Sequence, residues 1–329
     1  LQIKYANLVT SLANKIFKNK FLNHKSKNYN SNKKIKIGFI SSNFKFHSVS
    51  KTFKNWIINI NKNLFESFIF HIGNDFDEIS NTIKNSTNNF FSHTSVIKLA
   101  KKITFENLNI LIFLDIGMDP KVQILASQKL AQIQCCTWGH PSTSGFKSID
   151  YFFSSQLMET TNSQNYYSEK LLCLPSIGTV YDKINIKKID IKNAIKRTDT
   201  IKFLSNHSLF KLLPKNDHIF FDIQKKINKC EFHFFEGENK YITYKFIKRL
   251  KKLCLINNII YENFFYFHKR AEYKIYLKIL NQSDIILDNF GFSGFNTGIE
   301  AINLNKPIIT MPGKYMRGKL VYAILKKID

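Results

Sequence analysis

The sequence lacks an apolar run long enough to cross a membrane as a helix. Its clearest apolar runs, residues 110–114 and 285–287, have at most the length of a strand, whereas a spanning helix needs about 20 apolar residues. Residues 1–20 also lack the charged, apolar and small-residue order of a signal peptide. We therefore expect a cytoplasmic protein with no membrane span. Since the chain begins at Leu1 rather than Met, we expect it to be part of a longer protein.

Cysteine is scarce, and its arrangement does not suit a metal site. The chain has five cysteines, of which only Cys135 and Cys136 are close together, and it contains no C-x-x-C pair. An odd number of widely spaced thiols is typical of reduced cysteines in the cytoplasm.

Arginine is scarce as well, although the formal net charge is +25. A basic excess of that size is typical of proteins that bind nucleic acid or another polyanion. Here the excess is nearly all lysine, is spread along the chain and accompanies abundant Asn and Ile. Lysine also lacks the forked contact that arginine makes with phosphate. We favour a solvated lysine surface and keep a basic nucleic-acid or polyanion-binding module as the alternative from another functional class.

What the sequence does contain indicates a folded protein of two domains. Hydrophobic residues make up 44% and aromatic residues 14% of the chain, which argues against a disordered protein. At 329 residues the chain exceeds the usual size of one domain, so two domains of about 150 residues each are expected.

The first half of the chain alternates buried-type strands with amphipathic helices. Apolar residues at helical spacing predict a helix within 1–20, a polar and basic linker follows at 23–34, and a second helix is expected at 49–61. The strands expected in this half are 35–41, 65–71, 110–114, 132–135 and 149–153. Alternation of strands and helices predicts a parallel sheet.

A lysine-rich and weakly patterned segment at 176–200 separates this half from a second one with the same alternation. The strands expected there are 201–204, 231–235, 263–267, 285–288 and 307–311, and the expected helices are 216–228, 241–254, 271–281 and 297–304. We therefore predict an α/β protein of two Rossmann-like domains facing each other across a cleft. Its expected parts are an amino-terminal helix and linker (1–34), a first domain (35–175), a linker (176–200) and a second domain (201–329).

The run from Asp284 to Glu300 has the sequence of a phosphate-binding strand, loop and helix. The expected strand ends at Asp288, the loop that follows contains Ser293 and Gly294, and a helix opens directly after it. Free N–H groups at a helix start favour a bound phosphate, and small loop residues let the backbone approach it. An ordinary glycine-containing turn with a capped helix fits the same spacing equally well.

Three other segments follow predicted strands, where open parallel sheets bind their ligands. The loop 136–145 holds His140 among hydroxyl residues suited to a sugar or phosphate, although a tight turn around a packed Trp138 fits it as well. His47 has a side chain suited to proton transfer near neutral pH. Lys211 supplies a point charge for a phosphate. Taken singly, none of them is specific, since most lone histidines and lysines are not catalytic.

Seven segments in this order resemble one family, the O-linked N-acetylglucosamine transferase and SPINDLY-type protein glycosyltransferases, and its bacterial branch in particular. The resemblance extends over residues 36–326. It is carried by IGFISSNFKFHSVSKTF, DIGMDP, QCCTWGHPSTSGFKSIDYFFSS, YYSEKLLCLP, SLFKLLP, DIILDNFGFSGFNTGIEA and PIITMPGKYMRGKL. It implies a fold of the GT-B type, with an acceptor-side first domain and a second domain that holds most of the nucleotide-sugar donor.

The resemblance also implies roles for residues of the second domain. Lys211 matches the family lysine that contacts the donor diphosphate, and Asn296 and Thr297 match the loop and helix start that hold that diphosphate. Glu300 matches the acidic position on the ribose.

In the first domain, His47 matches a histidine of the acceptor-side loop that is considered for proton transfer, although the general base of the family is unsettled. His140, with Pro141 and Thr143, matches the loop that lines the donor pocket.

The function implied is an inverting transfer of N-acetylglucosamine from UDP-GlcNAc to Ser or Thr hydroxyls of a protein or peptide. The resemblance implies no metal and no other cofactor, and the lack of a D-x-D motif near a strand end agrees with this. We expect no nucleic acid as partner. Because some relatives use GDP-fucose as donor or Asn side chains as acceptor, another donor or acceptor is an alternative for this chain.

Three residues depart from the family pattern. Phe295 stands where the family usually has Gly or His, and its ring is expected to narrow or reshape the donor site. Asn43 replaces a common Asp, and Ser208, expected at the donor site, stands where relatives often carry an amide. The chain also stops at Asp329, ahead of the last helices of such domains, so we expect the second domain to be truncated.

Overall fold

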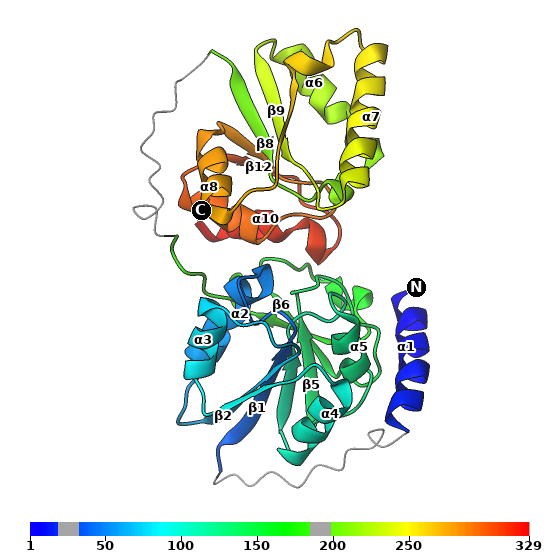
Figure 1. Cartoon of the computed structure of the whole chain (residues 1–329), viewed down its shortest axis with the longest axis vertical. Helices are drawn as coiled ribbons and strands as arrows, with labels where there is room; N and C mark the ends of the chain where they lie inside the picture. The colour runs from blue at the N-terminus through cyan, green and yellow to red at the C-terminus, as the bar shows by residue number, and fades with distance from the viewer. Residues whose placement is uncertain (19–32, 185–198, 329) are drawn as a thin grey trace. The chain divides into compact units, whose positions relative to one another are not determined.

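The computed structural model describes residues 1–18, 33–184 and 199–328. The chain divides into two compact units, Leu1–Asp182 and Lys183–Asp329 (Figure 1). Most of the two expected linkers, 23–34 and 176–200, lies outside the described residues.

The first unit is built on a seven-stranded parallel sheet with the strand order β3-β2-β1-β4-β5-β6-β7. Its strands are β1 (Ile35–Ser41), β2 (Phe65–His71), β3 (Asn89–Ser92), β4 (Ile110–Phe113), β5 (Ile133–Thr137), β6 (Tyr151–Ser155) and β7 (Lys170–Leu174). The central strands are apolar on both faces, and Ile40, Ile69 and Leu111 are fully buried. Continuous apolar strands of this kind are typical of a parallel sheet that helices cover on both sides.

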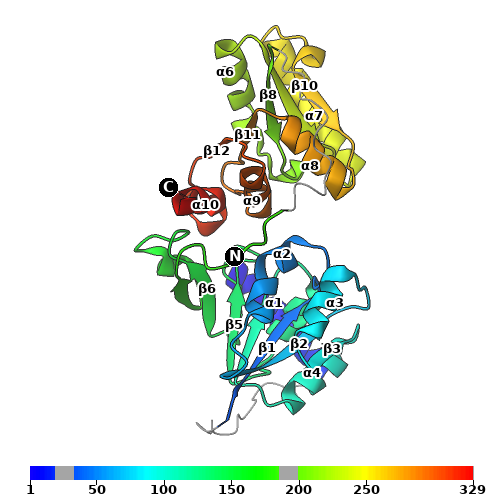
Figure 2. The same ribbon diagram turned by 90° about the vertical axis from the view of Figure 1, so that its left-hand side faces the viewer.

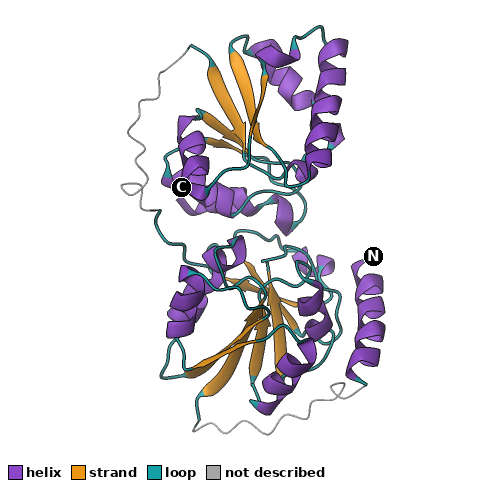
Figure 3. Ribbon diagram, viewed as in Figure 1, coloured by secondary structure: helices purple, strands orange, loops and turns teal. Residues whose placement is uncertain are grey.

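Helices cover both faces of this sheet (Figures 1 and 3). They are α1 (Gln2–Phe17), α2 (Ser48–Ile58), α3 (Glu78–Asn85), α4 (Val96–Phe105) and α5 (Pro120–Ala126). Helices α2 and α3 pack together on one side, while α5 contacts both α4 and α1 on the other. Asp77 starts α3 with a capping box to Ser80, and Asp119 caps α5 directly before Pro120, which satisfies N–H groups that a helix start leaves unpaired.

The second unit has a five-stranded parallel sheet with the order β10-β9-β8-β11-β12. Its strands are β8 (Ile201–Ser205), β9 (Cys230–Phe235), β10 (Phe265–His268), β11 (Ile285–Leu287) and β12 (Ile308–Ile309), and its helices are α6 (His218–Lys226), α7 (Lys240–Ile256), α8 (Tyr273–Gln282), α9 (Asn296–Asn303) and α10 (Leu320–Ile328). One face packs phenyl rings such as Phe232 and Phe234 against α6 and α7. The other face packs Leu204 and Ile286 against α8 and α9 (Figure 2).

The α/β class with two parallel sheets is confirmed, and every strand that the sequence predicts is present. The strand expected at 307–311 is shorter, with only Ile308–Ile309. The sequence analysis assigned no structure to α3, β3, α4, α5, β7 and α10. Strands β3 and β7 are short and at least partly exposed, so they show little of the apolar alternation that reveals a longer or more buried strand. Helices α3, α4 and α10 were missed although their apolar residues recur at helical spacing.

In each sheet the strand order reverses next to the strand that comes first in the chain. The reversal lies between β1 and β4 in the first unit and between β8 and β11 in the second. Connections from two such strands leave on opposite faces, so a crevice opens beyond their carboxyl ends, where α/β sheets bind ligands. Among the described helices, none is both long and apolar enough to span a bilayer.

Candidate functional site

The crevice of the second unit is organised by Asp288, which directly follows β11. Its Oδ2 accepts hydrogen bonds from the hydroxyls of Ser293 (2.6 Å) and Thr310 (2.7 Å). Its Oδ1 accepts one from the Gly294 N–H (2.9 Å) and lies 3.2 Å from Nε2 of His207, which follows β8. This one carboxylate therefore holds the loop between β11 and α9 against the ends of two neighbouring strands.

Asp288 remains ionised inside the unit. Burial is the largest single effect and raises the pKa of its carboxyl, but the hydrogen bonds from His207, Ser293 and Thr310 together outweigh burial and hold the pKa below its usual range. The loop fits tightly around this pair. A Cβ added at Gly294 would meet the Thr297 hydroxyl at 2.0 Å and His207 at 2.7 Å, so only glycine fits there.

Lys211 comes to the same loop from the connection after β8. It ends a short 3₁₀ turn, Leu209–Lys211, and its carbonyl accepts a hydrogen bond of 2.8 Å from the Asn289 amide. Its ammonium lies 4.1 Å from the centre of the Phe292 ring, a cation–π contact. Burial lowers the pKa of Lys211, and the charge of Asp288 opposes this only in part. The structure thus brings Lys211 to the segment that the sequence predicts as a diphosphate site.

Helix α9 begins at Asn296, directly behind this loop. Its cap residue, Phe295, makes no side-chain cap hydrogen bond within the described part of the chain, and the N–H groups of a helix start suit an anion. The Thr297 hydroxyl is buried and has no hydrogen-bond partner among the described residues. The helix start and Lys211 therefore provide N–H, O–H and ammonium donors along one loop.

Glu300 is placed differently from the expectation that it faces a ribose. Its side chain is buried, and its two oxygens accept hydrogen bonds of 2.9 Å from the hydroxyls of Tyr273 and Tyr276 on α8. Tyr276 in turn accepts a hydrogen bond of 3.0 Å from the Asn206 amide. Burial, together with the charge of Glu300, raises the pKa of both tyrosines. A ribose hydroxyl would have to reach this buried carboxylate beside the two tyrosine hydroxyls.

Of the two predicted donor-site serines, Ser293 differs from expectation, whereas the role of Ser208 stays a prediction. Ser293 is buried, donates to Asp288 and accepts a hydrogen bond from the Val321 N–H (2.9 Å), so its hydroxyl holds the loop rather than a ligand. Ser208 has an exposed side chain, and its carbonyl accepts the Lys211 N–H (2.9 Å).

Phe295, the residue expected to reshape the donor site, is 8% exposed. Most of its ring is therefore buried within the second unit.

The crevice of the first unit carries His47, the cap residue of α2. Nδ1 of His47 accepts the Val49 N–H at 3.3 Å. Burial, aided by Lys45 and Lys51, lowers the pKa of His47, so the ring is neutral at neutral pH. With Nδ1 engaged as an acceptor, the neutral ring has its proton on Nε2. In this arrangement His47 offers an N–H and would have to release its cap bond before it could take up a proton.

Asp115, at the end of β4, is a buried carboxyl in the same crevice that the sequence analysis did not single out. Its Oδ2 accepts hydrogen bonds from the Ser41 hydroxyl (2.7 Å) and the Asn43 amide (2.6 Å), while its Oδ1 has no hydrogen-bond partner in the described parts of the chain. Burial raises the pKa of Asp115 to about 6. Asn43, the second departure from the family pattern, thus fixes the start of the loop that carries His47.

The loop after β5 carries the other predicted residues of the first unit. A Cβ at Gly117 would meet the His140 ring at 2.7 Å, so that ring packs on the backbone that follows β4. Pro141 is buried. The Thr143 hydroxyl donates to the buried Glu169 at 2.7 Å, so this hydrogen bond holds the loop against the segment that carries Glu169.

The predicted site residues therefore form two groups, one in each unit. The second unit brings Lys211 together with the loop and helix start at 293–297, and the first unit places His47 and His140 beyond the ends of β1 and β5. Among its site residues the sequence analysis did not include three that organise these two groups, namely Asp115, His207 and Asp288. Each of them directly follows a strand or lies two residues beyond one. Among the described residues, no group of three or more His, Cys, Asp or Glu side chains is placed to hold a metal ion.

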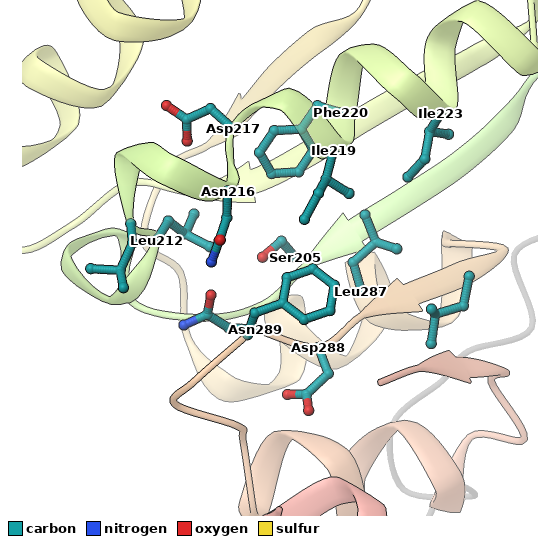
Figure 4. A pocket seen from close by; sticks show the side chains of 13 residues that line it. Ser205, Leu212, Asn216, Asp217, Ile219, Phe220, Ile223, Leu287, Asp288 and Asn289 are labelled. Carbon is teal, nitrogen blue, oxygen red and sulfur yellow. The ribbon is translucent and has the colours of Figure 1, made fainter. Parts of the chain in front are cut away.

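A cavity of about 210 Å³ lies beside Asp288, between the strand ends and the start of α6 (Figure 4). Its walls are mostly apolar, with Leu212, Phe220 and Leu287 among them. Within residues 1–18, 33–184 and 199–328, the buried Nδ2 of Asn216 has no hydrogen-bond partner. The cavity suits a small apolar group rather than a phosphate.

Comparison with known proteins relates most of the chain to one group of enzymes. Residues 1–210 match the sequence profile of glycosyl transferase family 41. The chain is 25% identical over 308 residues to the probable UDP-N-acetylglucosamine--peptide N-acetylglucosaminyltransferase SEC of Arabidopsis thaliana, with 89% of this chain and 30% of that protein covered. It is 23% identical over 218 residues to the UDP-glucose:protein N-beta-glucosyltransferase of Actinobacillus pleuropneumoniae serotype 5b, with 65% and 33% covered.

Among solved structures, the O-GlcNAc transferase of Thermobaculum terrenum, solved as a mutant, superimposes with a TM-score of 0.82 at 14% identity. The likeness covers 98% of this chain and 61% of that one. At this identity it shows the fold, and it extends over both units. The chain spans about a third of the length of the curated relatives named above.

Proposed function

Because the chain belongs to glycosyl transferase family 41, we propose that it moves a sugar from a nucleotide-sugar donor to a protein acceptor, with the donor diphosphate held between Lys211 and the start of α9. The observation that carries this proposal is the meeting of Lys211 with the loop after β11 at the reversal of the second sheet. Leaving-group charge develops on the diphosphate during transfer, and an ammonium and a helix start in a fixed loop stabilise such charge electrostatically.

The donor that we propose is a UDP-sugar, because the names of both compared relatives contain UDP. N-acetylglucosamine is the favoured sugar and a Ser or Thr hydroxyl the favoured acceptor. The name of the second relative specifies glucose and an N-linked product, so glucose and an Asn side chain are the alternatives. GDP-fucose is a third donor to test.

We propose direct displacement in which the acceptor oxygen attacks the anomeric carbon from the face opposite the leaving diphosphate. The configuration is then inverted, the acceptor proton is released, and the bond between sugar and diphosphate breaks. The Nε2–H of His47 suits a hydrogen bond to an oxygen of the acceptor or the sugar. Lys211 and the helix start act in place of a metal ion. Transfer that a chelator abolishes and added Mg²⁺ or Mn²⁺ restores would contradict the metal-independent part of this proposal.

The first test is equilibrium binding of UDP, UDP-GlcNAc, UDP-glucose and GDP-fucose, measured by calorimetry. We expect saturable binding of UDP and of at least one UDP-sugar, and a loss of about tenfold or more in affinity in Lys211→Met, because a charged hydrogen bond to phosphate is removed. Lys248→Met, on the exposed side of α7, is the matched control and should leave the affinity unchanged. Absence of binding by every nucleotide would refute the proposal.

A further inference from the structure

A second pocket of the second unit, of about 390 Å³, opens beside the loop after β11. It is lined by three loops, which follow β8, β11 and β12. Four cations line it, namely Lys211, Lys215, Lys314 and Arg317, and none of its lining residues is acidic. The remaining wall is aromatic, apolar or glycine.

Glycine backbones hold the loop after β12 against the loop after β11. A Cβ at Gly318 would lie 3.0 Å from the Gly313 Cα and 3.5 Å from the Gly291 Cα. The Gly313 N–H donates to the Gly318 carbonyl at 2.7 Å, and the Ser293 N–H donates to the Arg317 carbonyl at 2.7 Å. The loop that carries Arg317 and Lys314 is therefore fixed beside the proposed diphosphate site.

The pocket has an inner wall and an outer rim that differ in exposure. Lys211 and Phe292, on the inner wall, are half-buried and belong to the proposed diphosphate site. On the outer rim, Phe210 is 67% and Tyr315 41% exposed. The guanidinium of Arg317 lies 5.0 Å from the centre of the Tyr315 ring, which keeps the cation on an aromatic platform at the mouth.

The rim carries more cations than the proposed diphosphate site does. At that site Lys211 is the cation beside the start of α9, and Asp288, whose charge raises the pKa of Lys211, is contacted by four donors. Three further cations, Lys215, Lys314 and Arg317, line the same pocket. Cations gathered beside aromatic surface and without an acidic lining residue favour an anionic ligand.

We propose that this rim, made of Lys215, Lys314 and Arg317, binds an acidic side chain of a peptide acceptor, so that the protein prefers acceptors with Asp or Glu near the modified residue. The inference rests on the proposed function, since the acceptor must reach the sugar next to the diphosphate. A peptide fits better than nucleic acid here, because the cations surround one pocket of limited volume, whereas a nucleic-acid surface tracks a backbone with a stripe of charge.

The test compares two fluorescein-labelled peptides with a central Ser, one flanked by four Glu and the other by four Gln, by fluorescence anisotropy with and without saturating UDP. We expect the wild-type protein to bind the Glu peptide about tenfold more tightly or better. In the double variant Lys314→Glu/Arg317→Glu, the ratio of the affinity for the Glu peptide to that for the Gln peptide should fall to about one or below one. Lys248→Glu/Lys252→Glu, on the exposed side of α7, changes the net charge equally and should keep the ratio.

Three results would overturn the inference. If the control variant loses the ratio as fully as the pocket variant, the preference comes from net charge alone. If the pocket variant loses UDP affinity, the rim cations belong to the donor site. If a single-stranded oligothymidine binds more tightly than the Glu peptide and depends on the same two residues, the rim serves nucleic acid. If UDP does not bind, the proposed function is refuted but the rim is still tested. The relative affinity for the two peptides is also measured without UDP, so the two failures can be distinguished.

Discussion

His207 and Asp288 meet at the reversal of the second sheet, with Nε2 of the imidazole 3.2 Å from Oδ1 of the carboxylate and 3% and 2% of the two side chains exposed. His207 follows strand β8 and Asp288 follows strand β11, and these two strands are neighbours in the sheet but far apart in the chain. The contact between the two residues joins the connection that carries Lys211 to the loop that leads into α9. The geometry of the proposed diphosphate site therefore depends on one buried contact between an imidazole and a carboxylate.

Asp288→Asn should destabilise the second unit and abolish nucleotide binding together. An amide cannot accept hydrogen bonds at both positions where Asp288 now does, so two or more buried donors lose their partner. We expect a loss of about 3 kcal/mol in the free energy of unfolding, measured in urea. Asp222→Asn, at an exposed position of α6, is the control and should change it by less than about 0.5 kcal/mol. Normal UDP affinity in Asp288→Asn would contradict the organising role.

Lys211→Met should weaken UDP binding without lowering the thermal stability of the protein. Burial disfavours the charged form of Lys211, and the methionine side chain keeps most of its apolar contacts with the Phe292 ring. We therefore expect the thermal midpoint without ligand to stay the same or rise slightly, while the stabilisation that UDP confers on the wild type is largely lost. A lower midpoint without ligand would show that Lys211 serves mainly to hold the loop.

Tyr276→Phe should lower the free energy of unfolding more than Tyr273→Phe does. The Tyr276 hydroxyl joins Glu300 to Asn206, so its removal takes one hydrogen-bond partner from each of two buried groups, whereas the Tyr273 hydroxyl donates to Glu300. We expect about 1 to 3 kcal/mol for Tyr276→Phe, measured by urea unfolding, and a smaller loss for Tyr273→Phe. Equal costs would show that the bond to Asn206 contributes nothing. Tyr244→Phe, on an exposed residue of α7, provides the control.

Asp115 should make the stability of the first unit depend on pH. Its pKa is raised from 3.8 to about 6, so the folded state holds this proton more tightly than the unfolded state does. Its contribution to stability is complete below about pH 4 and is lost as the pH rises through 6. Between these limits, wild type should lose about 2 to 3 kcal/mol relative to Asp115→Asn. Urea unfolding at several pH values measures this difference, and exposed Asp75→Asn should show none.

Phe295→Ala should weaken the fold without improving the donor site. The ring is 8% exposed, so its removal should cost about 3 kcal/mol of unfolding free energy through lost burial and a cavity. Phe295→Leu, which keeps apolar bulk, should cost less than about 1.5 kcal/mol. Calorimetry with UDP-GlcNAc should show no gain in affinity in either variant. A clear gain in Phe295→Leu would show that the ring obstructs the donor.

The sequence by itself determined the alternation of strands and helices, because short apolar runs such as Ile110–Phe113, separated by amphipathic segments, are typical of the buried strands of a parallel sheet. It also determined where to look for the site, since Lys211 and the loop before α9 both follow strands whose carboxyl ends share one edge. The exposed edge strand β7 shows too little apolar alternation to be predicted from the sequence.

Only the tertiary structure decided what each polar side chain contacts. Ser293 and Glu300 belong to the same phosphate-type segment, yet one is held by Asp288 and the Val321 N–H and the other by Tyr273 and Tyr276. The partners outside that segment lie more than twenty residues away in the chain. A hydrogen bond between residues so far apart forms only when packed helices and strands bring the two groups together, and no local pattern in the sequence records that distance.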